Sequence, residues 1–215
     1  MIPDWPAERR DMVARQLQAR DIRDPRVLAA MGEIRREEFL PLDVRVLSYR
    51  DEPAPIGYGQ TISQPYMTAF MAQVLGLEGT EKTLDVGAGS GYHAAVLARL
   101  ARTVWSIEIV PALVERARRN LARAGGSANV HVVKGDGSLG FVEEAPYQAI
   151  SVGAGAPDVP PALIDQLDDP GVLVIPVGPL KDQSLLVITK RRGRVRRKTV
   201  AHCRFVPLRG GEGWQ

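Results

Sequence analysis

Five apolar runs of β type, each six to eight residues long, place the strongest limit on how this chain can fold. They lie at 83–88, 103–109, 130–135, 147–154 and 171–178. Patterns typical of amphipathic helices separate most of them, at 91–100, 111–124 and 161–167. Strands that alternate with helices and are nearly continuous in valine and isoleucine favour a parallel sheet with both faces covered. We therefore predict an α/β fold with a doubly wound, mostly parallel sheet and helices on both faces.

The N-terminal part of the chain departs from this alternation. Residues 7–20 and 25–40 each have the apolar spacing of an amphipathic helix, and Asp24-Pro25 supplies a helix cap followed by a first-turn proline. A third helical pattern covers 65–75. We expect these segments to add helices in front of the sheet.

The C-terminal part departs from it too. The runs 184–190 and 199–206 have no helical pattern between them, so they are expected to form an antiparallel pair. A chain of 215 residues is long enough for one well-buried core. We expect one domain over 1–215, with a helical extension and a binding loop in 1–65 and a cofactor-binding α/β core in 66–215.

The positive charge of the chain is concentrated in one short segment. The net charge is +3, but residues 190–198, KRRGRVRRK, hold seven of the 28 lysines and arginines. The remaining 21 basic residues are outnumbered by 25 acidic ones. Because the segment lies between two β-type runs and contains Gly193, it is typical of a solvated hairpin tip. We expect no nucleic-acid partner, and the role of this segment stays open.

Other classes of protein are disfavoured by simple features. No run approaches the 18 apolar residues of a membrane span, and the charged start of the chain is unlike a secretory signal. Cys203 is the only cysteine, which excludes an internal disulfide and a multi-thiolate zinc site. The expected protein is cytoplasmic and monomeric, with no membrane partner.

A glycine-rich turn follows the first of the five runs. In sheets of this kind, ligands bind at the carboxyl ends of the strands, and the first β–α turn is the usual place. Here the turn carries Gly87, Gly89 and Gly91 in the spacing G-x-G-x-G, and Asp85 precedes it by two residues. Glycines allow a ligand to approach the backbone closely. A carboxylate at this place suits a ligand with an ammonium and a sulfonium group better than it suits a pyrophosphate.

Two further acids follow the next two runs. Glu108 ends the second run, where a carboxylate can accept hydrogen bonds from both hydroxyls of a ribose. Asp136 lies between two glycines after the third run and can face an adenine amino group. Taken singly, Asp85 could be a cap, Glu108 a surface acid and Asp136 part of a turn. Together they favour S-adenosylmethionine as the ligand, with NAD as the weaker alternative.

S-adenosylmethionine is a methyl donor, and the residues available for catalysis limit which chemical groups could accept the methyl group. Cys203 lies in an expected strand far from the turns, so it is unsuited to a cytosine C5 reaction. The segment 152–161 lacks the aromatic residue of a site for amine methylation, and no cluster of acids and amides suggests a metal. His93 lies in the first turn after the glycine loop and could touch a ligand, but we expect it on a helix surface. His131 and His202 are expected in strands, so none of the three is a good general base.

A carboxylate acceptor needs no base, because it is already ionised at pH 7. Its reaction with a sulfonium removes both charges, so a dry pocket favours the transition state. The protein then only has to aim one oxygen, and Thr61, Ser63 and Gln64 offer suitable hydrogen-bond donors. They lie just before Pro65, at the start of a predicted helix whose N-terminus favours an anion.

At this point the chain resembles the protein-L-isoaspartate (D-aspartate) O-methyltransferase family, which has the Rossmann-like class I methyltransferase fold. The resemblance covers nearly the whole chain, and GQTISQP and FVPL are its most specific motifs. The matching segments are VLAAMGEIRREEFL (27–40), PIGYGQTISQPYM (55–67), LDVGAGSGYHAAVLA (84–98), VKGDG (133–137), APDVPPALIDQL (156–167), VLVIPVG (172–178) and RFVPLRGGEGW (204–214). The chain departs from the family pattern mildly at 153–156 and 169–171.

The resemblance implies a repair enzyme that acts on isoaspartyl proteins and peptides. It would transfer a methyl group from S-adenosylmethionine to the free α-carboxylate of L-isoaspartyl residues, and D-aspartyl residues are a further acceptor. The products would be S-adenosylhomocysteine and an ester that collapses to a succinimide. Ser63 would occupy the active-site position, with Thr61, Ile62 and Gln64 framing the acceptor. The residues implied to hold the cofactor are Asp85, Gly87, Ala88, Gly89, Ser90, Gly91, Glu108, Ile109, Asp136 and Gly137.

Two alternatives remain open from the sequence. A methyltransferase that acts on RNA or on a small molecule would explain the basic segment 190–198. A cofactor-binding sensor without catalysis would need no acceptor site, although the GQTISQP motif argues for one.

Overall fold

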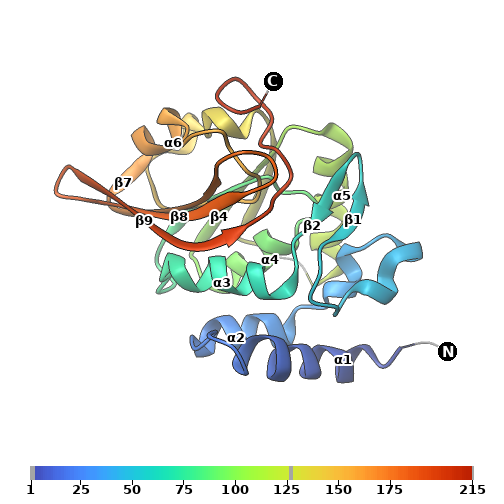
Figure 1. Ribbon diagram of the computed structural model, residues 1–215. Helices are drawn as coiled ribbons and strands as arrows, with labels where there is room; N and C mark the ends of the chain where they lie inside the picture. Colours follow the sequence, from blue (N-terminus) through green and yellow to red (C-terminus); the bar gives the residue numbers. More distant parts are fainter. Residues whose placement is uncertain (1–2, 126–127, 215) are drawn as a thin grey trace.

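A seven-stranded sheet forms the centre of the protein in the computed structural model, which describes residues 3–125 and 128–214 (Figure 1). The strand order is β5-β4-β3-β6-β7-β8-β9. All pairs from β5 to β7 are parallel, and β8 and β9 are added in antiparallel orientation. The strands are β3 (Lys82–Val86), β4 (Thr103–Glu108), β5 (Val130–Lys134), β6 (Tyr147–Val152), β7 (Leu167–Val177), β8 (Gln183–Arg191) and β9 (Arg194–Cys203). The predicted mostly parallel sheet is confirmed.

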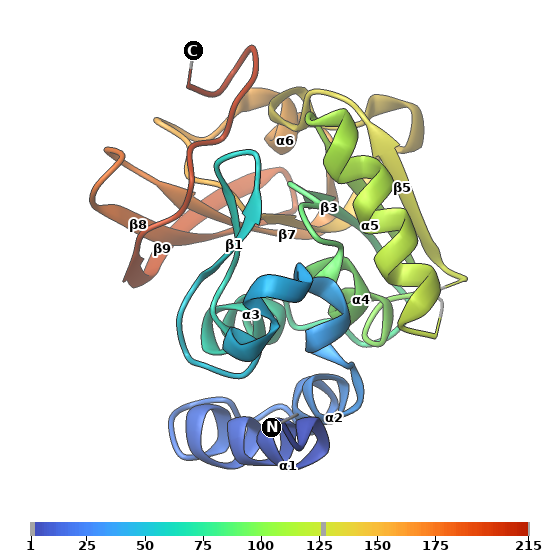
Figure 2. The same cartoon turned by 90° about the vertical axis from the view of Figure 1, so that its right-hand side faces the viewer.

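Helices cover both faces of this sheet, as predicted. On one face, α3 (Pro65–Leu75), α4 (Tyr92–Ala98) and α5 (Pro111–Arg123) share a hydrophobic core with Val104, Ala149 and other inward side chains. On the other face, α6 (Pro161–Asp165) contributes to a second core around Leu84 and Ile150. Figure 2 shows the sheet between these two layers. The central strands β3, β4 and β6 are buried on both faces because their side chains alternate between the two cores.

The N-terminal segment forms a further layer outside α3. It consists of α1 (Trp5–Asp11), a π-helical stretch (Met12–Gln18) and α2 (Pro25–Glu33), which lie below α3 in Figure 1. Asp24 caps α2 by accepting from two backbone N–H groups, as the sequence predicted. The prediction of one helix over 25–40 is wrong beyond Glu33. Ile34 has extended backbone angles, and a separate 3₁₀ turn (Arg36–Phe39) follows it.

A small hairpin lies directly before α3, in the part of the chain where the sequence indicated a binding loop. Its strands are β1 (Ala54–Gly57) and β2 (Gln60–Ile62). Tyr58 and Gly59 make the turn with φ of 55° and 70°, the backbone that two-residue hairpin turns need. Arg116 of α5 donates a hydrogen bond to the carbonyl of Ile56, which ties the hairpin to the core.

The basic segment is part of a hairpin, but most of its residues belong to strands. β9 begins at Arg194, not near 199 as predicted. The turn is Arg192-Gly193, whose N–H groups donate to the Asp169 carboxylate at 2.7 and 2.5 Å. Lys190 is paired with Gly171, at the amino-terminal half of β7. The segment therefore lies at the opposite end of the sheet from the carboxyl ends of the parallel strands.

The order of the strands fixes where a ligand site can form. From β3 the chain moves outward to β4 and β5, and then crosses to β6 on the other side of β3. The carboxyl ends of β3 and β6 thus form the switch point at which sheets of this class bind ligands. The chain segments that follow these two strands are the glycine turn and residues 153–156.

Gly91 provides a test of this packing, because it starts α4 with φ of 89°. A Cβ atom at this position would lie 3.2 to 3.3 Å from atoms of Ala117 in α5. We expect Gly91→Ala to lower the free energy of unfolding by about 2–4 kcal/mol, since it adds both backbone strain and overpacking. Urea unfolding measures this loss.

Gly193→Ala is the matched control. Gly193 also has positive φ, at 71°, but a Cβ there would meet nothing within 4 Å. The expected loss is about 1 kcal/mol, from backbone strain alone. Equal losses for the two variants would contradict the packing role of Gly91.

Candidate functional site

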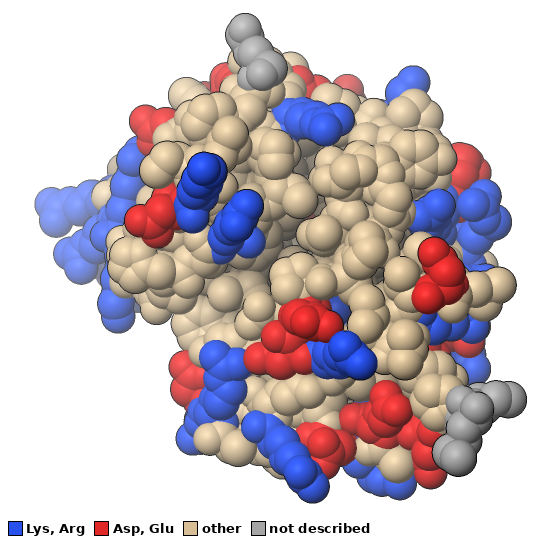
Figure 3. Space-filling view, turned by 45° about the vertical axis from the view of Figure 1, so that its right-hand side comes forward, with Lys and Arg blue, Asp and Glu red and all other residues tan. Residues whose placement is uncertain are grey.

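Three cavities meet at the switch point, and all three are lined by Thr61 and Gly153. The first, the strand-end cleft, is lined also by Gly87, Gly89, Ile107, Glu108, Ile109, Val110, Gly137 and Leu208. The second, the turn pocket, is lined also by Ile62, Ser63, Asp85, Ala88, Ser90 and His93. The third, the outer groove, is lined also by Ser63, Gln64, Tyr66, Cys203, Arg204 and Phe205. Figure 3 shows a hollow in the middle of this face, bordered mainly by uncharged residues.

The glycine turn forms the floor between the first two cavities. Gly87 and Gly89 have φ of 93° and 53°, so a side chain at either position would strain the backbone. The N–H groups of Gly87 and Ala88 both donate to the carbonyl of Ile107, at 2.9 and 3.1 Å. Gly91 lines none of these cavities, and its contact with Ala117 gives it a packing role. The other four glycine-turn residues of the predicted site all border a cavity.

Glu108 holds this turn in place and also borders the strand-end cleft. Its carboxylate accepts hydrogen bonds from the N–H of Gly89 at 2.8 Å and from the N–H of Val110 at 2.9 Å. The side chain is buried, with 6% of its surface exposed. Each oxygen retains a further lone pair, so the carboxylate could also accept from ligand hydroxyls in the cleft.

Asp85 lines the turn pocket and has one buried oxygen without a hydrogen-bond partner among the described residues. It lies beside Ser106 of β4 in the sheet register, and the Ser106 hydroxyl donates to Oδ2 at 2.7 Å. Oδ1 has no hydrogen-bond partner among the described residues. Burial raises the pKa of Asp85 to about 7; the Ser106 bond opposes this shift and the nearby Glu108 adds to it. A buried oxygen of this kind needs a donor, and a cationic group in the pocket would supply one.

Asp136 is held by three hydrogen bonds to neighbouring segments of the chain. Its Oδ1 accepts from the N–H and the hydroxyl of Ser138 at 2.9 and 2.7 Å, and its Oδ2 accepts from the N–H of Gly211 at 2.7 Å. These bonds hold the pKa of Asp136 below its usual value, although partial burial alone would raise it. The neighbouring Gly137 borders the strand-end cleft, whereas Asp136 itself is not among the lining residues. A contact between Asp136 and adenine stays a prediction.

Residues 60–65, the acceptor loop, separate the turn pocket from the outer groove. Thr61 is exposed at the junction of the three cavities, and Ile62 is buried in the core behind it. Ser63 lines both the turn pocket and the outer groove, and Gln64 lines only the groove. The hydroxyl of Ser63 forms no hydrogen bond with another described residue, so it is available to a ligand.

Arg36 supports the acceptor loop from behind and was not singled out by the sequence. Its side chain is fully buried, and its Nη2 donates to the carbonyl of Ser63 at 2.7 Å. Its Nε donates to the carbonyl of Ser48, also at 2.7 Å. The guanidinium lies 4.6 Å from the ring centre of Tyr92, at the start of α4. The segment IRREEFL continues a helical pattern, so nothing local marks Arg36 as buried.

Two expectations about single residues are wrong. His93 is not on a helix surface: its Nε2 lies 2.9 Å from the Ser151 hydroxyl, it borders the turn pocket, and burial lowers its pKa to about 4. Cys203 is not far from the turns, because it lines the outer groove with Ser63. Burial raises the pKa of the Cys203 thiol to about 11, so it is a poor nucleophile.

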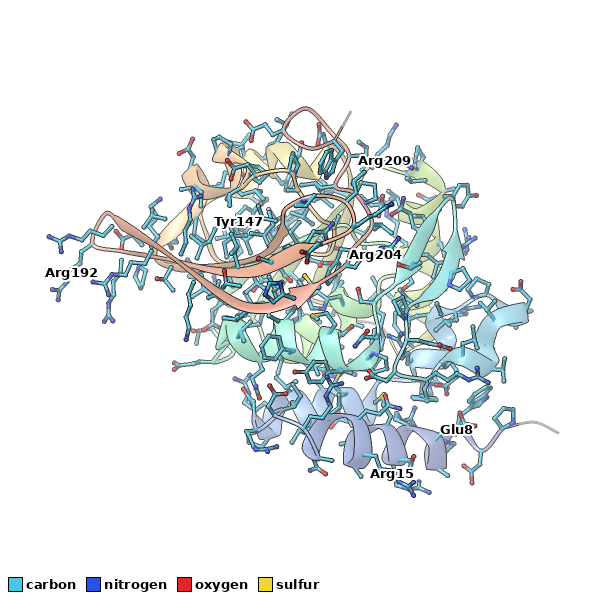
Figure 4. The ribbon with its side chains drawn as sticks, viewed as in Figure 1. Glu8, Arg15, Tyr147, Arg192, Arg204 and Arg209 are labelled. Atoms are coloured by element: carbon cyan, nitrogen blue, oxygen red, sulfur yellow. The ribbon has the colours of Figure 1, made fainter. Side chains whose placement is uncertain are left out.

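The C-terminal strip, residues 204–209, closes the other side of the cavities. Gly155 donates to the carbonyl of Val206, and Leu208 donates back to the carbonyl of Gly155, both at 2.8 Å. Val206 and Leu208 therefore border the strand-end cleft. Figure 4 shows Arg204 and Arg209 on this strip, where it passes the β1–β2 hairpin. The FVPL motif marked the strip in the sequence, but its place in the cleft was not predicted.

Two negative findings concern the described residues only. They contain no group of three or more histidine, cysteine, aspartate or glutamate side chains that could hold a metal ion. None of their helices has the length and the apolar content that a membrane span requires.

Comparison with known sequences gives one consistent result. A family model described as protein-L-isoaspartate(D-aspartate) O-methyltransferase matches residues 7–213. A protein-L-isoaspartate O-methyltransferase from Methanoculleus marisnigri is 50% identical over 208 residues, which are 97% of this chain and 94% of the relative. A second such enzyme, from Marinobacter nauticus, is 52% identical over 96% of this chain and 94% of its own length.

Solved structures agree with the sequences. A crystal structure of a protein-L-isoaspartate O-methyltransferase from Plasmodium falciparum superposes with a TM-score of 0.81. The two proteins are 27% identical, and the match covers 97% of this chain and 99% of that one. That protein was crystallised in complex with S-adenosyl-L-homocysteine.

The raised pKa of Asp85 makes a prediction about pH. Its folded-state pKa of about 7 lies above the value of an unfolded aspartate, so the folded protein binds this proton more tightly. The free energy of unfolding of the ligand-free protein should fall between about pH 4 and pH 7. Asp85→Asn should remove this part of the fall and raise stability at pH 8 by a few kcal/mol. Urea unfolding from pH 5 to 8 tests both statements.

The same variant should bind the cofactor less well. A ligand ammonium next to Asp85 favours the ionised carboxylate, so binding should release a proton below pH 7. Calorimetry in buffers of different ionisation enthalpy measures that release in the wild type and its loss in Asp85→Asn. Equal proton release by the two proteins would contradict the proposed contact.

Arg36 generates a separate prediction about the acceptor loop. Lysine keeps the charge but cannot donate to Ser48 and Ser63 in the same fixed geometry. We expect Arg36→Lys to raise the KM for an isoaspartyl peptide about tenfold or more, and to change the affinity for S-adenosylhomocysteine less than threefold. Peptide kinetics and calorimetry give the two numbers.

Arg45→Lys is the control, because Arg45 is an arginine of the same region that pairs with Glu38 and not with the loop. Arg45→Lys should leave the KM for peptide and the affinity for S-adenosylhomocysteine near those of the wild type. If Arg36→Lys lowered stability without changing the KM for peptide, Arg36 would have only a structural role.

Proposed function

The chain belongs to the protein-L-isoaspartate(D-aspartate) O-methyltransferase family, and we propose that it methylates the free α-carboxylate of L-isoaspartyl residues in damaged proteins and peptides. It is an S-adenosylmethionine-dependent methyltransferase. The ester would then collapse to a succinimide, which begins repair. The observation that carries this proposal is the junction at Thr61 and Gly153, where the strand-end cleft and the turn pocket meet the outer groove.

The chemistry of the lining residues fits S-adenosylmethionine. The Glu108 carboxylate would accept from the ribose hydroxyls, beside Ile109 and Gly137 in the strand-end cleft. The unpartnered Oδ1 of Asp85 would accept from the amino group of the methionine part, in the turn pocket with Ala88 and Ser90. The glycine turn between them leaves room for the ligand, since side chains there are excluded by the backbone. S-adenosylmethionine supplies a methyl group bound to a positively charged sulfur.

The acceptor loop would position the attacking oxygen. A carboxylate is ionised at pH 7 and carries no proton to remove, so its oxygen forms the new bond to the methyl carbon while the carbon–sulfur bond breaks. Both charges disappear in this step, and a pocket with little water favours it. The free hydroxyl of Ser63 and the side chains of Thr61 and Gln64 would aim the oxygen. Positioning of this kind contributes about 7–11 kcal/mol in favourable cases.

The arrangement of the site supports a reaction without a general base. His93 is the one histidine among the lining residues of the turn pocket, and it is held by Ser151 with a pKa of about 4. It therefore stays neutral. The basic segment 190–198 lies at the far end of β8 and β9 from the acceptor loop, so it gives no support to RNA as the methyl acceptor.

We also propose the setting in which the protein works. The acceptors would be isoaspartyl proteins and peptides, and the protein would act as a monomer in the cytosol. Residues 1–215 would form one domain, with a helical extension and acceptor loop in 1–65. The support for one domain is that Met12 and Val27 of the extension share a hydrophobic core with Ala94 and Leu113.

A paired assay tests the proposed activity. The protein is incubated with methyl-labelled S-adenosylmethionine and either an isoaspartyl peptide or the same peptide with normal aspartate. We expect label in the isoaspartyl peptide alone, as an ester that is lost in mild base. Equal labelling of the two peptides, or none, would overturn the proposal.

Ser63→Ala extends this assay to the site. Removing a hydrogen bond to a charged oxygen costs about 1.5–3 kcal/mol, so we expect turnover to fall about ten- to a hundredfold. The affinity for S-adenosylhomocysteine is the internal control and should stay within about threefold. A comparable loss of cofactor affinity would place Ser63 on the cofactor side of the junction.

A further inference from the structure

The outer groove is where the acceptor chain must lie, if the proposed function is right. It runs between the acceptor loop and the C-terminal strip, and it meets the cofactor cavities at four shared lining residues, Thr61, Ser63, Gly153 and Val206. When the reacting residue enters this junction, the residues on either side of it stay in the groove. The charges that line the groove therefore act on the side chains that flank the isoaspartyl residue.

The groove is positively charged. Its described lining residues include no aspartate or glutamate, and three of them can carry a positive charge: Arg20, His202 and Arg204. Arg20 is already neutralised, because its Nη1 lies 2.9 Å from Asp51 and its guanidinium is stacked on Tyr66. His202 lies 3.8 Å from Asp182 at the exposed end of the groove.

Arg204 is the positively charged lining residue that forms no ion pair with another described residue. Its side chain is exposed and forms no hydrogen bond or ion pair with another described residue. It follows β9 directly, on the side of the sheet that faces the β1–β2 hairpin (Figure 4). A carboxylate that enters the groove would thus meet one guanidinium that forms no ion pair with an acidic side chain of the described residues.

We propose that Arg204 selects isoaspartyl acceptors that carry an acidic side chain next to the damaged residue. The reacting carboxylate itself is an unsuitable partner for Arg204. It loses its charge in the transition state, so an ion pair with it would stabilise the bound acceptor more than the transition state and would slow the reaction. A carboxylate on a flanking residue keeps its charge throughout, and its attraction to Arg204 serves binding alone.

The effect should be small and sensitive to salt. Ion pairs between exposed groups are weak and are screened within about 10 Å at 0.1 M salt. We therefore expect a flanking glutamate to lower the KM for peptide about two- to fivefold relative to glutamine. A flanking lysine should raise it by a similar factor. The turnover number at saturating peptide should be nearly the same for all three.

The test uses three isoaspartyl peptides of one length, with glutamate, glutamine or lysine on both sides of the isoaspartyl residue. Each is assayed with the full-length protein at 0.05 M and 0.5 M salt. The variants are Arg204→Gln, Arg204→Glu and, as a control, Arg192→Glu. Arg192 lies in the turn between β8 and β9, at the other end of these strands, so the control changes the net charge equally without touching the groove.

The wild type and Arg192→Glu should prefer glutamate over glutamine and glutamine over lysine at low salt, with little preference at high salt. Arg204→Gln should bind the three peptides equally, and Arg204→Glu should reverse the order. An unchanged order in Arg204→Glu, or an equal effect of Arg192→Glu, would overturn the proposal.

The outcomes separate this proposal from the proposed function. If the wild type methylates all three peptides with one KM, Arg204 has no selective role and the isoaspartyl activity stands. If the wild type methylates none of them, the proposed activity itself is wrong.

Discussion

The carboxylate of Glu108 holds together the two turns on which the cofactor site depends. It accepts from Gly89 in the glycine turn after β3 and from Val110 at the start of the segment after β4. Both turns leave adjacent parallel strands at their carboxyl ends, where backbone N–H groups have no partner in the sheet. One buried acid satisfies two of these groups and fixes the distance between the turns. The floor of the cleft is therefore formed before any ligand arrives.

Other side chains in the site also join two separate segments of the chain. Arg36 joins the Ser48 and Ser63 carbonyls behind the acceptor loop, and Asp136 joins the 3₁₀ turn after β5 to the C-terminal strip through Ser138 and Gly211. Glu108 can have a structural and a ligand-binding role at once, because its carboxylate binds two backbone N–H groups and still borders the cleft. Asp85 is the exception, since one of its oxygens is buried without any partner among the described residues. That oxygen is costly to the free protein, and a ligand would relieve the cost.

The sequence predicted well what depends on local pattern. The parallel strand runs and the glycine turn are found where valine-rich periodicity and glycine spacing indicated them. The final antiparallel pair is also present, although β9 begins at Arg194 and not near 199. Because parallel strands end at one edge of the sheet, this pattern also brought Asp85 and Glu108 to one place. The β1–β2 hairpin was missed because Tyr58-Gly59 is not one of the usual turn pairs, and a positive φ is uncommon for a tyrosine.

Features that depend on the path of distant segments were not predicted. Arg36 follows a helical pattern in the sequence, and only the end of α2 at Glu33 brings it under the acceptor loop. Cys203 was separated from the loop by 140 residues, yet β9 ends beside it. The C-terminal strip reaches the cleft through hydrogen bonds with Gly155, and no periodicity reveals such a contact. The family resemblance predicted the function, but the places of these residues in the site could be found only from the structure.

The position of β9 at the edge of the sheet has a consequence for an enzyme that handles aged proteins. Among the described strands, β9 pairs on one side only, and its other side offers N–H and carbonyl groups to any extended chain. Damaged and partly unfolded acceptors are a source of such chains. Arg194, Arg196, Arg197 and Lys198 are exposed along this edge, and crowded like charges oppose the docking of a further strand. The charged edge of the sheet is therefore a poor template for strand addition.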